Sequence, residues 1–170
     1  MRKLIQNKLK DQKGLTLIEL LAVIVILAII AAIAIPAIGN IINNSRVGAI
    51  KSDAQNALAA ADLFLIDNPN HFDPNATTPE TEIEMADLNP GYLDDQGSFA
   101  DDAANFSITQ VEGELVITGD GSIGGVTLSF DGANKATINE LTNNAEEDDV
   151  VNETDADGDA FLGTVTVTSK

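Results

Sequence analysis

Three aspartates near the C-terminus have the type and spacing of potential metal ligands. The stretch "DADGD" places Asp155, Asp157 and Asp159 at alternating positions. Carboxylate oxygens suit calcium, a hard cation that takes about six to eight oxygen ligands. The stretch is not an EF-hand loop, because Ala160 and Thr166 stand where a glycine and a bidentate glutamate belong. Two interpretations therefore stay open: a calcium site at these three aspartates, and an acidic turn in contact with solvent.

The remaining reactive side chains form no catalytic pattern. The chain has no cysteine, which excludes disulfides, thiolate zinc sites and thiol nucleophiles. Its only histidine, His71, stands in a loop rich in proline and asparagine, where we expect it to contact solvent. The glycine-rich stretch 119–125 lies between two expected strands and does not open a helix, so it is not a phosphate-binding loop. We therefore predict a protein that is not an enzyme and requires no cofactor, with Ca2+ as its one candidate ligand.

Charge is unevenly distributed along the 170 residues. Residues 1–14 hold five of the nine bases and one of the 27 acids, a net charge of +4. The rest of the chain therefore has four bases, 26 acids and a net charge of −22. A surface this acidic repels polyanions, so we expect no direct binding of nucleic acid.

An apolar run follows the basic head. From Leu15 to Ile38 only Thr16 and Glu19 are plainly polar. A helix of this length spans about 36 Å at roughly 1.5 Å per residue, enough for an apolar bilayer core of about 30 Å. Basic residues stay on the cytoplasmic side. We therefore expect a single-pass protein of the cytoplasmic membrane whose N-terminus is cytoplasmic and whose residues after the run lie outside.

A small residue suited to signal cleavage, Gly14, stands before the apolar run, whereas an ordinary signal peptide has it after the run. Cleavage there would remove the basic leader and keep the hydrophobic helix. Glu19 would then lie near the edge of the bilayer, where a charged carboxylate costs free energy, on the order of a few kcal/mol if it sits deep and unpaired. Pairing with the new α-amino group of Leu15 in a neighbouring chain would neutralise both charges. The alternative is a carboxylate that snorkels to the membrane surface.

The stretch "KGLTLIE" resembles the class III signal of type IV pilins and pseudopilins, and the apolar run is most similar to those of Gram-positive bacteria. Pro36 falls at mature position 22 (36 − 14), where that family commonly has proline. The resemblance implies cleavage between Gly14 and Leu15 by a prepilin peptidase and N-methylation of Leu15. It also implies roles in assembly for Glu19 and Pro36. Leu15 is a mild departure, since many members of the family have phenylalanine there.

The helix that carries this motif should be long. We predict one helix over residues 15–66, kinked or loosened near Pro36 and stopped by "DNPN" at 67–70. Its second half has apolar residues at helical spacing, which predicts one buried face. That face consists of Val47, Ile50, Ala54, Ala57, Ala61 and Phe64.

Beyond the helix, residues 67–104 read as a connection with a short helix at 82–88, and residues 105–170 read as an antiparallel sheet. Alternating apolar residues predict strands at 105–111, 114–118, 126–130, 135–139 and 161–169, separated by turns at 112–113, 119–125 and 131–134. Residues 142–160 read as a solvated acidic loop. One face of the sheet should hold Phe106, Ile108, Leu115, Ile117, Val126, Leu128 and Phe130. The predicted fold is α+β, with a long N-terminal helix packed on a C-terminal antiparallel sheet, as in pilins.

These features predict three segments: a cleaved leader 1–14, a transmembrane and filament-core segment 15–42, and a globular head 43–170. The function that we expect is a major pilin, a structural subunit that forms a helical homopolymer on the cell surface for adhesion, motility or aggregation. Its partners would be itself, a prepilin peptidase, an assembly platform, minor pilins and, before assembly, the membrane. The alternatives are a pseudopilin of a secretion or DNA-uptake machine and a membrane-anchored binding protein that never polymerises.

Overall fold

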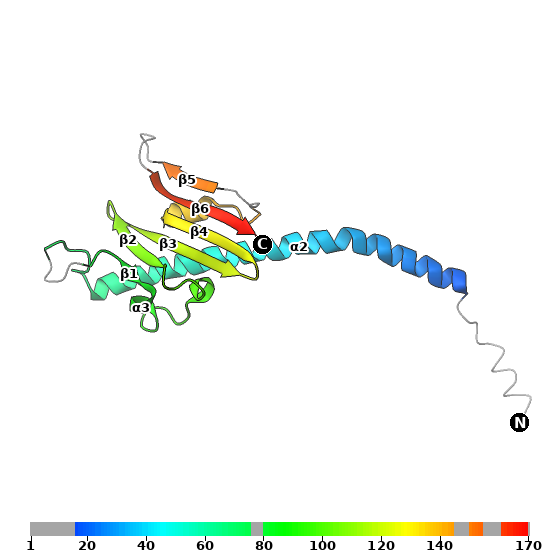
Figure 1. Ribbon diagram of the computed structural model, residues 1–170, viewed down its shortest axis with the longest axis horizontal. Coiled ribbons are helices and arrows are strands. Elements are labelled where there is room, and N and C mark those ends of the chain that lie inside the picture. The colour runs from blue at the N-terminus through cyan, green and yellow to red at the C-terminus, as the bar shows by residue number, and fades with distance from the viewer. Residues whose placement is uncertain (1–15, 76–79, 145–149, 155–160, 170) are drawn as a thin grey trace, which may run out of the picture. The chain divides into compact units, whose positions relative to one another are not determined.

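The computed structural model describes residues 16–75, 80–144, 150–154 and 161–169. The chain divides into two compact units, one that reaches to Asn40 and one that begins at Ile41. A single helix, α2 (Leu17–Asp67), contributes to both. In the second unit, the C-terminal part of α2 packs against an antiparallel sheet (Figure 1). The predicted α+β architecture is therefore confirmed.

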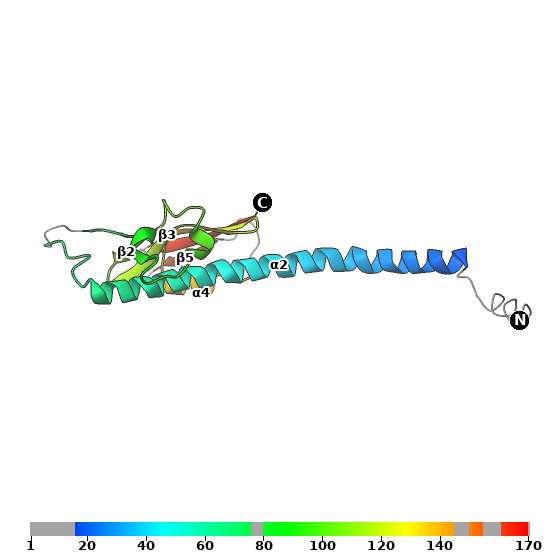
Figure 2. The same ribbon diagram turned by 90° about the horizontal axis from the view of Figure 1, so that it is seen from below.

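The predicted buried face of α2 is confirmed. Val47, Ile50, Ala54, Ala57 and Ala61 are buried, and Phe64 packs partly buried at the edge of the same core. Three of these six side chains are alanines, and such small residues allow a helix to approach a sheet closely. Figure 2 shows this part of the helix running along one side of the sheet. The observed bounds of α2 lie within two residues of the predicted 15–66.

The sheet has six strands in the order β1-β2-β3-β4-β6-β5, and every neighbouring pair is antiparallel. The strands are β1 (Ile83–Glu84), β2 (Ser107–Val111), β3 (Glu114–Ile123), β4 (Val126–Ala133), β5 (Val150–Thr154) and β6 (Phe161–Ser169). All seven residues that were predicted to share the apolar face belong to the core, with Leu115 only partly buried. The strand predicted at 161–169 is confirmed as β6.

Two tight turns connect the central strands. Glu112 and Gly113 join β2 to β3 with φ values of 52° and 92°, and Gly124 and Gly125 join β3 to β4 with 58° and 90°. Positive φ at both central residues gives the twist that two-residue hairpins require. The turn predicted over 119–125 was too long, because β3 continues to Ile123 and only two residues form the turn. Likewise β4 continues to Ala133 through much of the turn predicted at 131–134.

The strand predicted at 135–139 is wrong, because these residues belong to the helix α4 (Lys135–Glu140). Asn134 caps it: its Oδ1 accepts hydrogen bonds from the backbone N–H groups of Ala136 and Thr137, both at 2.9 Å. Asparagine is among the most favourable N-cap residues. Four or five alternating residues fit a short helix as well as a strand, and the cap decides between them.

The acidic segment 142–160 is not entirely loop. It contains β5, which forms the sheet edge beside β6 through pairs such as Val151 with Val165. The segment predicted as a short helix at 82–88 divides into β1 and the helix α3 (Met85–Leu88). A 3-10 turn, η1 (Gly97–Phe99), completes the connection and buries Phe99 against Phe106 and Phe130.

Two side chains of α2 hold α4 in place. The Lys51 Nζ donates hydrogen bonds to the backbone carbonyl of Leu141 and, at 3.4 Å, to the Asn143 Oδ1. The Gln55 Nε2 donates to the Asn139 Oδ1 at 2.7 Å. A lysine at the C-terminal carbonyls of a short helix interacts favourably with the partial negative charge there. These contacts explain why the segment after β4 turns back onto α2.

Candidate assembly helix

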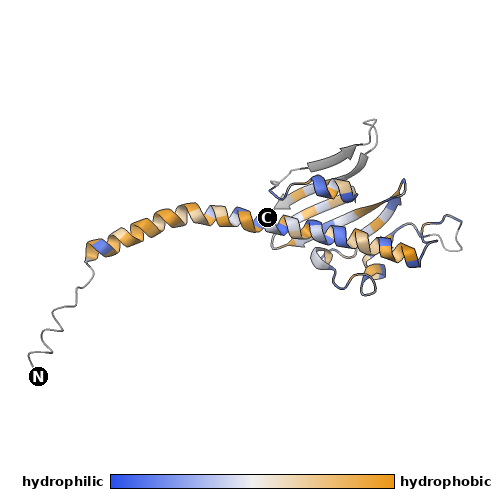
Figure 3. Ribbon diagram, turned by 180° about the vertical axis from the view of Figure 1, so that it is seen from behind, coloured by the Kyte–Doolittle hydropathy of each residue, from blue (hydrophilic) through white to orange (hydrophobic). Residues whose placement is uncertain are grey.

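The N-terminal half of α2 exposes an apolar surface on every side. Sixteen large hydrophobic side chains between Leu17 and Ile42 are exposed, from 45% at Ile42 to 88% at Leu17. Figure 3 shows this segment in the colours of hydrophobic residues. By length and composition, α2 is the one helix in the described part of the chain that could cross a membrane. A surface of this kind is stable in a bilayer or against other apolar helices, and unfavourable in water.

Glu19 is the acidic residue of the first turn of α2, and its side chain has two hydrogen bonds. The Glu19 Oε2 accepts one from the Thr16 backbone N–H at 2.9 Å and one from the Thr16 hydroxyl at 2.8 Å. The Glu19 backbone N–H in turn donates to the Thr16 Oγ1 at 3.2 Å. This reciprocal arrangement is a capping box, in which Thr16 is the N-cap and Glu19 the third helical residue.

The capping box was missed by the sequence analysis, although the signal was present as Thr-x-x-Glu before an apolar run. It gives Glu19 a structural role within one chain in addition to the predicted role between chains. Both hydrogen bonds use Oε2, and in the described part of the chain no donor contacts Oε1. The capping box therefore leaves one carboxylate oxygen to accept a cation from outside the chain.

Pro36 lies inside α2, and the backbone is helical at Pro36 and on both sides of it. The predicted loosening of the helix near Pro36 is therefore wrong for the single chain, whereas the alternative, a kink, stays a prediction. A proline in a helix lacks the N–H that would bond to the residue four positions earlier.

Five of the predicted site residues lie outside the part of the chain that the structure describes. Gly14 and Leu15, the predicted cleavage and methylation residues, lie outside the described residues. The same holds for Asp155, Asp157 and Asp159 of the predicted calcium site. Among the residues that the structure describes, no group of three or more histidine or acidic side chains could hold a metal ion.

His71 is more constrained than the sequence suggested. Its ring packs edge-on against Phe64 and Phe72, with centroid distances of 5.0 and 4.9 Å. Its Nε2 lies 3.0 Å from the backbone carbonyl oxygen of Glu82. His71 is half-buried, so the predicted contact with solvent is only partial, and its ring also joins the loop after α2 to the segment that enters the sheet.

Residues 9–35 match one protein-family model, described as the prokaryotic N-terminal methylation motif. The match spans Gly14, Leu15 and Glu19 and ends just before Pro36. The chain carries the class III signal of type IV pilins. No curated protein and no solved structure was found to match the chain.

The methylation motif accounts for the order of basic residues, Gly14 and apolar run at the N-terminus. Proteins that carry this motif are typically processed by a prepilin peptidase and assemble into pili, and the motif supports a protein of the pilin or pseudopilin type. Together with the exposed apolar helix, it is consistent with anchoring in a membrane and with a place in a surface pilus. The motif ends before the second unit begins at Ile41, so the α+β unit must be interpreted from its own residues.

Proposed function

We propose that this protein is a major pilin, a structural subunit that polymerises through α2 into a type IV pilus on the cell surface. One observation carries the proposal: the helix that begins within the methylation motif exposes sixteen large apolar side chains. These side chains need a membrane before assembly and a bundle of neighbouring helices afterwards. Adhesion, motility or aggregation would follow from the filament that the subunits build.

The proposed steps begin in the membrane. Residues 1–14 stay in the cytoplasm as a leader, residues 15–42 cross the membrane, and residues 43–170 form the head outside. A prepilin peptidase cuts between Gly14 and Leu15 and methylates the new amine of Leu15. An assembly platform and minor pilins then pass the subunit into the filament. Glu19 pairs with the Leu15 amine of a neighbouring copy, because an apolar filament core strongly favours neutralised charges over separate ones.

The methylation motif also fits a pseudopilin of a secretion or DNA-uptake machine, so filament length must be measured. We expect negative-stain microscopy of shear fractions to show long filaments from producing cells and none after deletion of the gene. Short or absent filaments in cells that make the mature protein would favour a pseudopilin. A protein that stays in the membrane as single chains would favour an anchored binding protein.

Processing is tested separately by the intact mass of the filament protein. We expect a chain that begins at Leu15 and carries one added methyl group. Gly14→Val should block cleavage, because a branched side chain hinders close approach of the peptidase to the backbone, and unprocessed chains should accumulate in the membrane. Gly39→Ala is the matched control, since nothing lies within 4 Å of the added methyl group. Filaments that retain residues 1–14 would contradict the proposal.

A further inference from the structure

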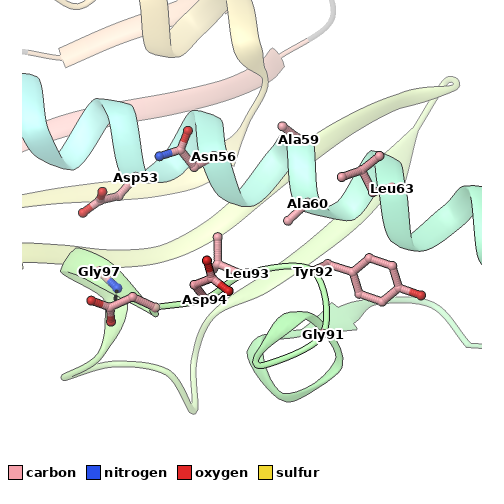
Figure 4. A pocket seen from close by; sticks show the side chains of 11 residues that line it. Asp53, Asn56, Ala59, Ala60, Leu63, Gly91, Tyr92, Leu93, Asp94 and Gly97 are labelled. Carbon is pink, nitrogen blue, oxygen red and sulfur yellow. Dashed lines mark hydrogen bonds between the residues drawn. The ribbon is translucent and has the colours of Figure 1, made fainter.

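An open pocket lies within the second unit, between α2 and the loop that follows α3. Helix α2 lines it with Asp53, Asn56, Ala59, Ala60 and Leu63, and residues of the loop 91–97 line the other side. Figure 4 shows this part of α2 running past the loop that carries Leu93 and Asp94. The pocket has a volume of about 510 Å³. We call it the α2–loop groove.

Hydrogen bonds hold the loop against the helix at both ends of the groove. The Asp53 Oδ2 accepts a hydrogen bond from the Ser98 backbone N–H at 2.8 Å. The Tyr92 hydroxyl donates to the Asp67 Oδ2 at 2.9 Å. Because α2 and the loop are joined at two places, the groove is formed before any partner arrives.

The lining of the α2–loop groove combines apolar and acidic groups. Ala59, Ala60 and Leu63 supply an apolar wall, and Leu63 is 55% exposed. Asp53, Asp94 and Asp95 add carboxylates. A side chain with an apolar stem and a cationic head matches both parts of this lining. Arginine is the best such side chain, because its guanidinium binds carboxylates through two parallel hydrogen bonds.

Arg46 is a cation of this chain that lacks an acidic partner in the part that the structure describes. Its Nη1 donates to the Asn43 Oδ1 at 3.2 Å. Its guanidinium lies over the β3–β4 turn, where a Cβ on Gly124 would come within 2.7 Å of the Nε. Only four bases remain once residues 1–14 are removed, against 26 acids. Among the described residues, Arg46 is therefore a cation without a carboxylate partner in a strongly acidic head.

We propose that Arg46 of one copy enters the α2–loop groove of a second copy and pairs there with Asp53 and Asp94. This inference rests on the proposed polymer of parallel subunits. Pairing Leu15 of one copy with Glu19 of the next offsets parallel helices by four residues, or about 6 Å. Two copies that are two steps apart along the polymer are offset by eight residues. Residue 46 of one copy then lies level with residue 54 of the other, one position from Asp53. An offset of this size would thus bring Arg46 level with the groove along the helix axis.

Charge favours a second copy as the occupant. The heads, residues 43–170, carry four bases and 25 acids, a net charge of −21, and repel one another when they are packed closely. A contact between Arg46 and the carboxylates of a neighbouring head replaces repulsion by attraction at one place between the two heads. It would also fix the rotation of each head relative to its neighbour, because the guanidinium needs a defined approach to form two hydrogen bonds.

The absence of cysteine allows a direct test by disulfide formation in the full-length protein. Filaments of a chain with both Arg46→Cys and Asp94→Cys should, after mild oxidation, give a ladder of dimers, trimers and larger species on a non-reducing gel. Each single variant should give no ladder. Lys135→Cys with Asp94→Cys is the matched control, since Lys135 is an exposed cation on α4, away from the groove. A ladder in the control alone, or none in the test pair, would overturn the proposal.

Charge reversal gives an independent readout. Arg46→Glu and Asp94→Arg should each lower filament yield strongly, and the double variant should restore it, because the pair is re-formed with opposite polarity. Membrane insertion and leader cleavage should be unchanged in all three. If wild-type cells make filaments but both single variants keep full yield, or the double variant yields no more than either single one, the groove contact is excluded. If wild-type cells make no filaments, the proposed pilus itself fails, which is a different result.

Discussion

At the scale of single residues, Glu19 has two roles that its position in the helix brings together. Within the chain it completes the capping box with Thr16. Between chains it is proposed to pair with the Leu15 amine. Replacement by alanine would remove both the cap and the charge, so it cannot separate the two roles. Glutamine can take the place of glutamate in a capping box but carries no charge.

We therefore predict that Glu19→Gln abolishes filaments while the protein still inserts in the membrane. Thr16→Ala, which keeps the charge and removes the N-cap side chain, should cost about 1 kcal/mol of helix stability and leave filaments in place. Filament yield in shear fractions and the amount of protein in the membrane measure the two effects. Wild-type yield in Glu19→Gln would refute the pairing and favour a carboxylate that snorkels.

Tyr92 offers a second prediction at this scale. Its hydroxyl donates a hydrogen bond to Asp67, and this bond, with burial and the nearby negative charge, raises the pKa of Tyr92 above its usual value of 10.0. A raised pKa means that the protonated phenol favours the folded state. The stabilisation should therefore be present below pH 10 and disappear as pH rises through the folded pKa.

The measurement is simple because the chain has one tyrosine and no tryptophan. Ultraviolet absorbance of the phenolate, followed against pH in detergent-solubilised protein, should show a midpoint above 10. Asp67→Ala should bring that midpoint down toward 10. Asp62→Ala is the control, since this exposed aspartate on the same helix does not bond to Tyr92. Equal midpoints in the two variants would show that the hydrogen bond does not control the titration.

At the scale of elements, the approach of β3 to α2 depends on Gly121. A Cβ at this position would lie 2.6 Å from the Ile50 Cγ2 and 3.1 Å from the Ser98 Oγ. Both neighbours are buried, so neither can move freely. Overpacking of a filled core typically costs about 1–3 kcal/mol. The glycine therefore allows the sheet to pack directly on the helix.

We predict that Gly121→Ala lowers the free energy of unfolding of the second unit by about 1–3 kcal/mol. Gly91→Ala should be nearly neutral, because no atom lies within 4 Å of its added methyl group. Urea unfolding of the two variants, followed by circular dichroism, compares them directly. Similar unfolding midpoints would show that the core can relax around the added methyl group.

Also at this scale, short elements were the least predictable. The pattern at 135–139 fitted a strand, but Asn134 caps a helix there and Lys51 and Gln55 hold that helix on α2. Strand β5 was hidden in an acidic segment, and its pairing with β6 is what makes it a strand. In both cases the deciding contacts come from residues distant in sequence, which a local pattern does not contain.

At the scale of the whole molecule, the calcium site at Asp155, Asp157 and Asp159 stays a prediction from sequence. Three carboxylates within five residues repel one another, and a divalent cation between them would relieve that repulsion. If calcium binds the folded state, the melting temperature should be higher in millimolar calcium than in chelator. Magnesium should have less effect, because it gives up its water reluctantly.

Asp157→Ala should remove the effect of calcium on the melting temperature. Asp131→Ala is the matched control, since this exposed aspartate lies on β4 and outside the predicted site. An unchanged melting temperature in the wild-type chain, or the same shift in Asp157→Ala, would identify the triplet as an acidic turn in contact with solvent.

The sequence by itself determined the long helix, the apolar character of its first half, the buried face of its second half and the main strands. These features are periodic over many residues, and periodicity reports burial directly. The methylation motif was likewise readable from consecutive residues, because a peptidase recognises a short linear segment. Thr16 and Glu19 stand three positions apart, so even their capping box could be read from the chain.

Only the tertiary structure decided what depends on contacts between distant segments. It placed α4 and β5, showed His71 between two aromatic rings, and formed the α2–loop groove between residues 53–63 and 91–97. It also left Arg46 half-buried with no carboxylate partner among the residues that the structure describes. Each of these features is set by which segments meet when the core closes. That choice minimises the free energy of the whole unit, and no single stretch of the sequence contains it.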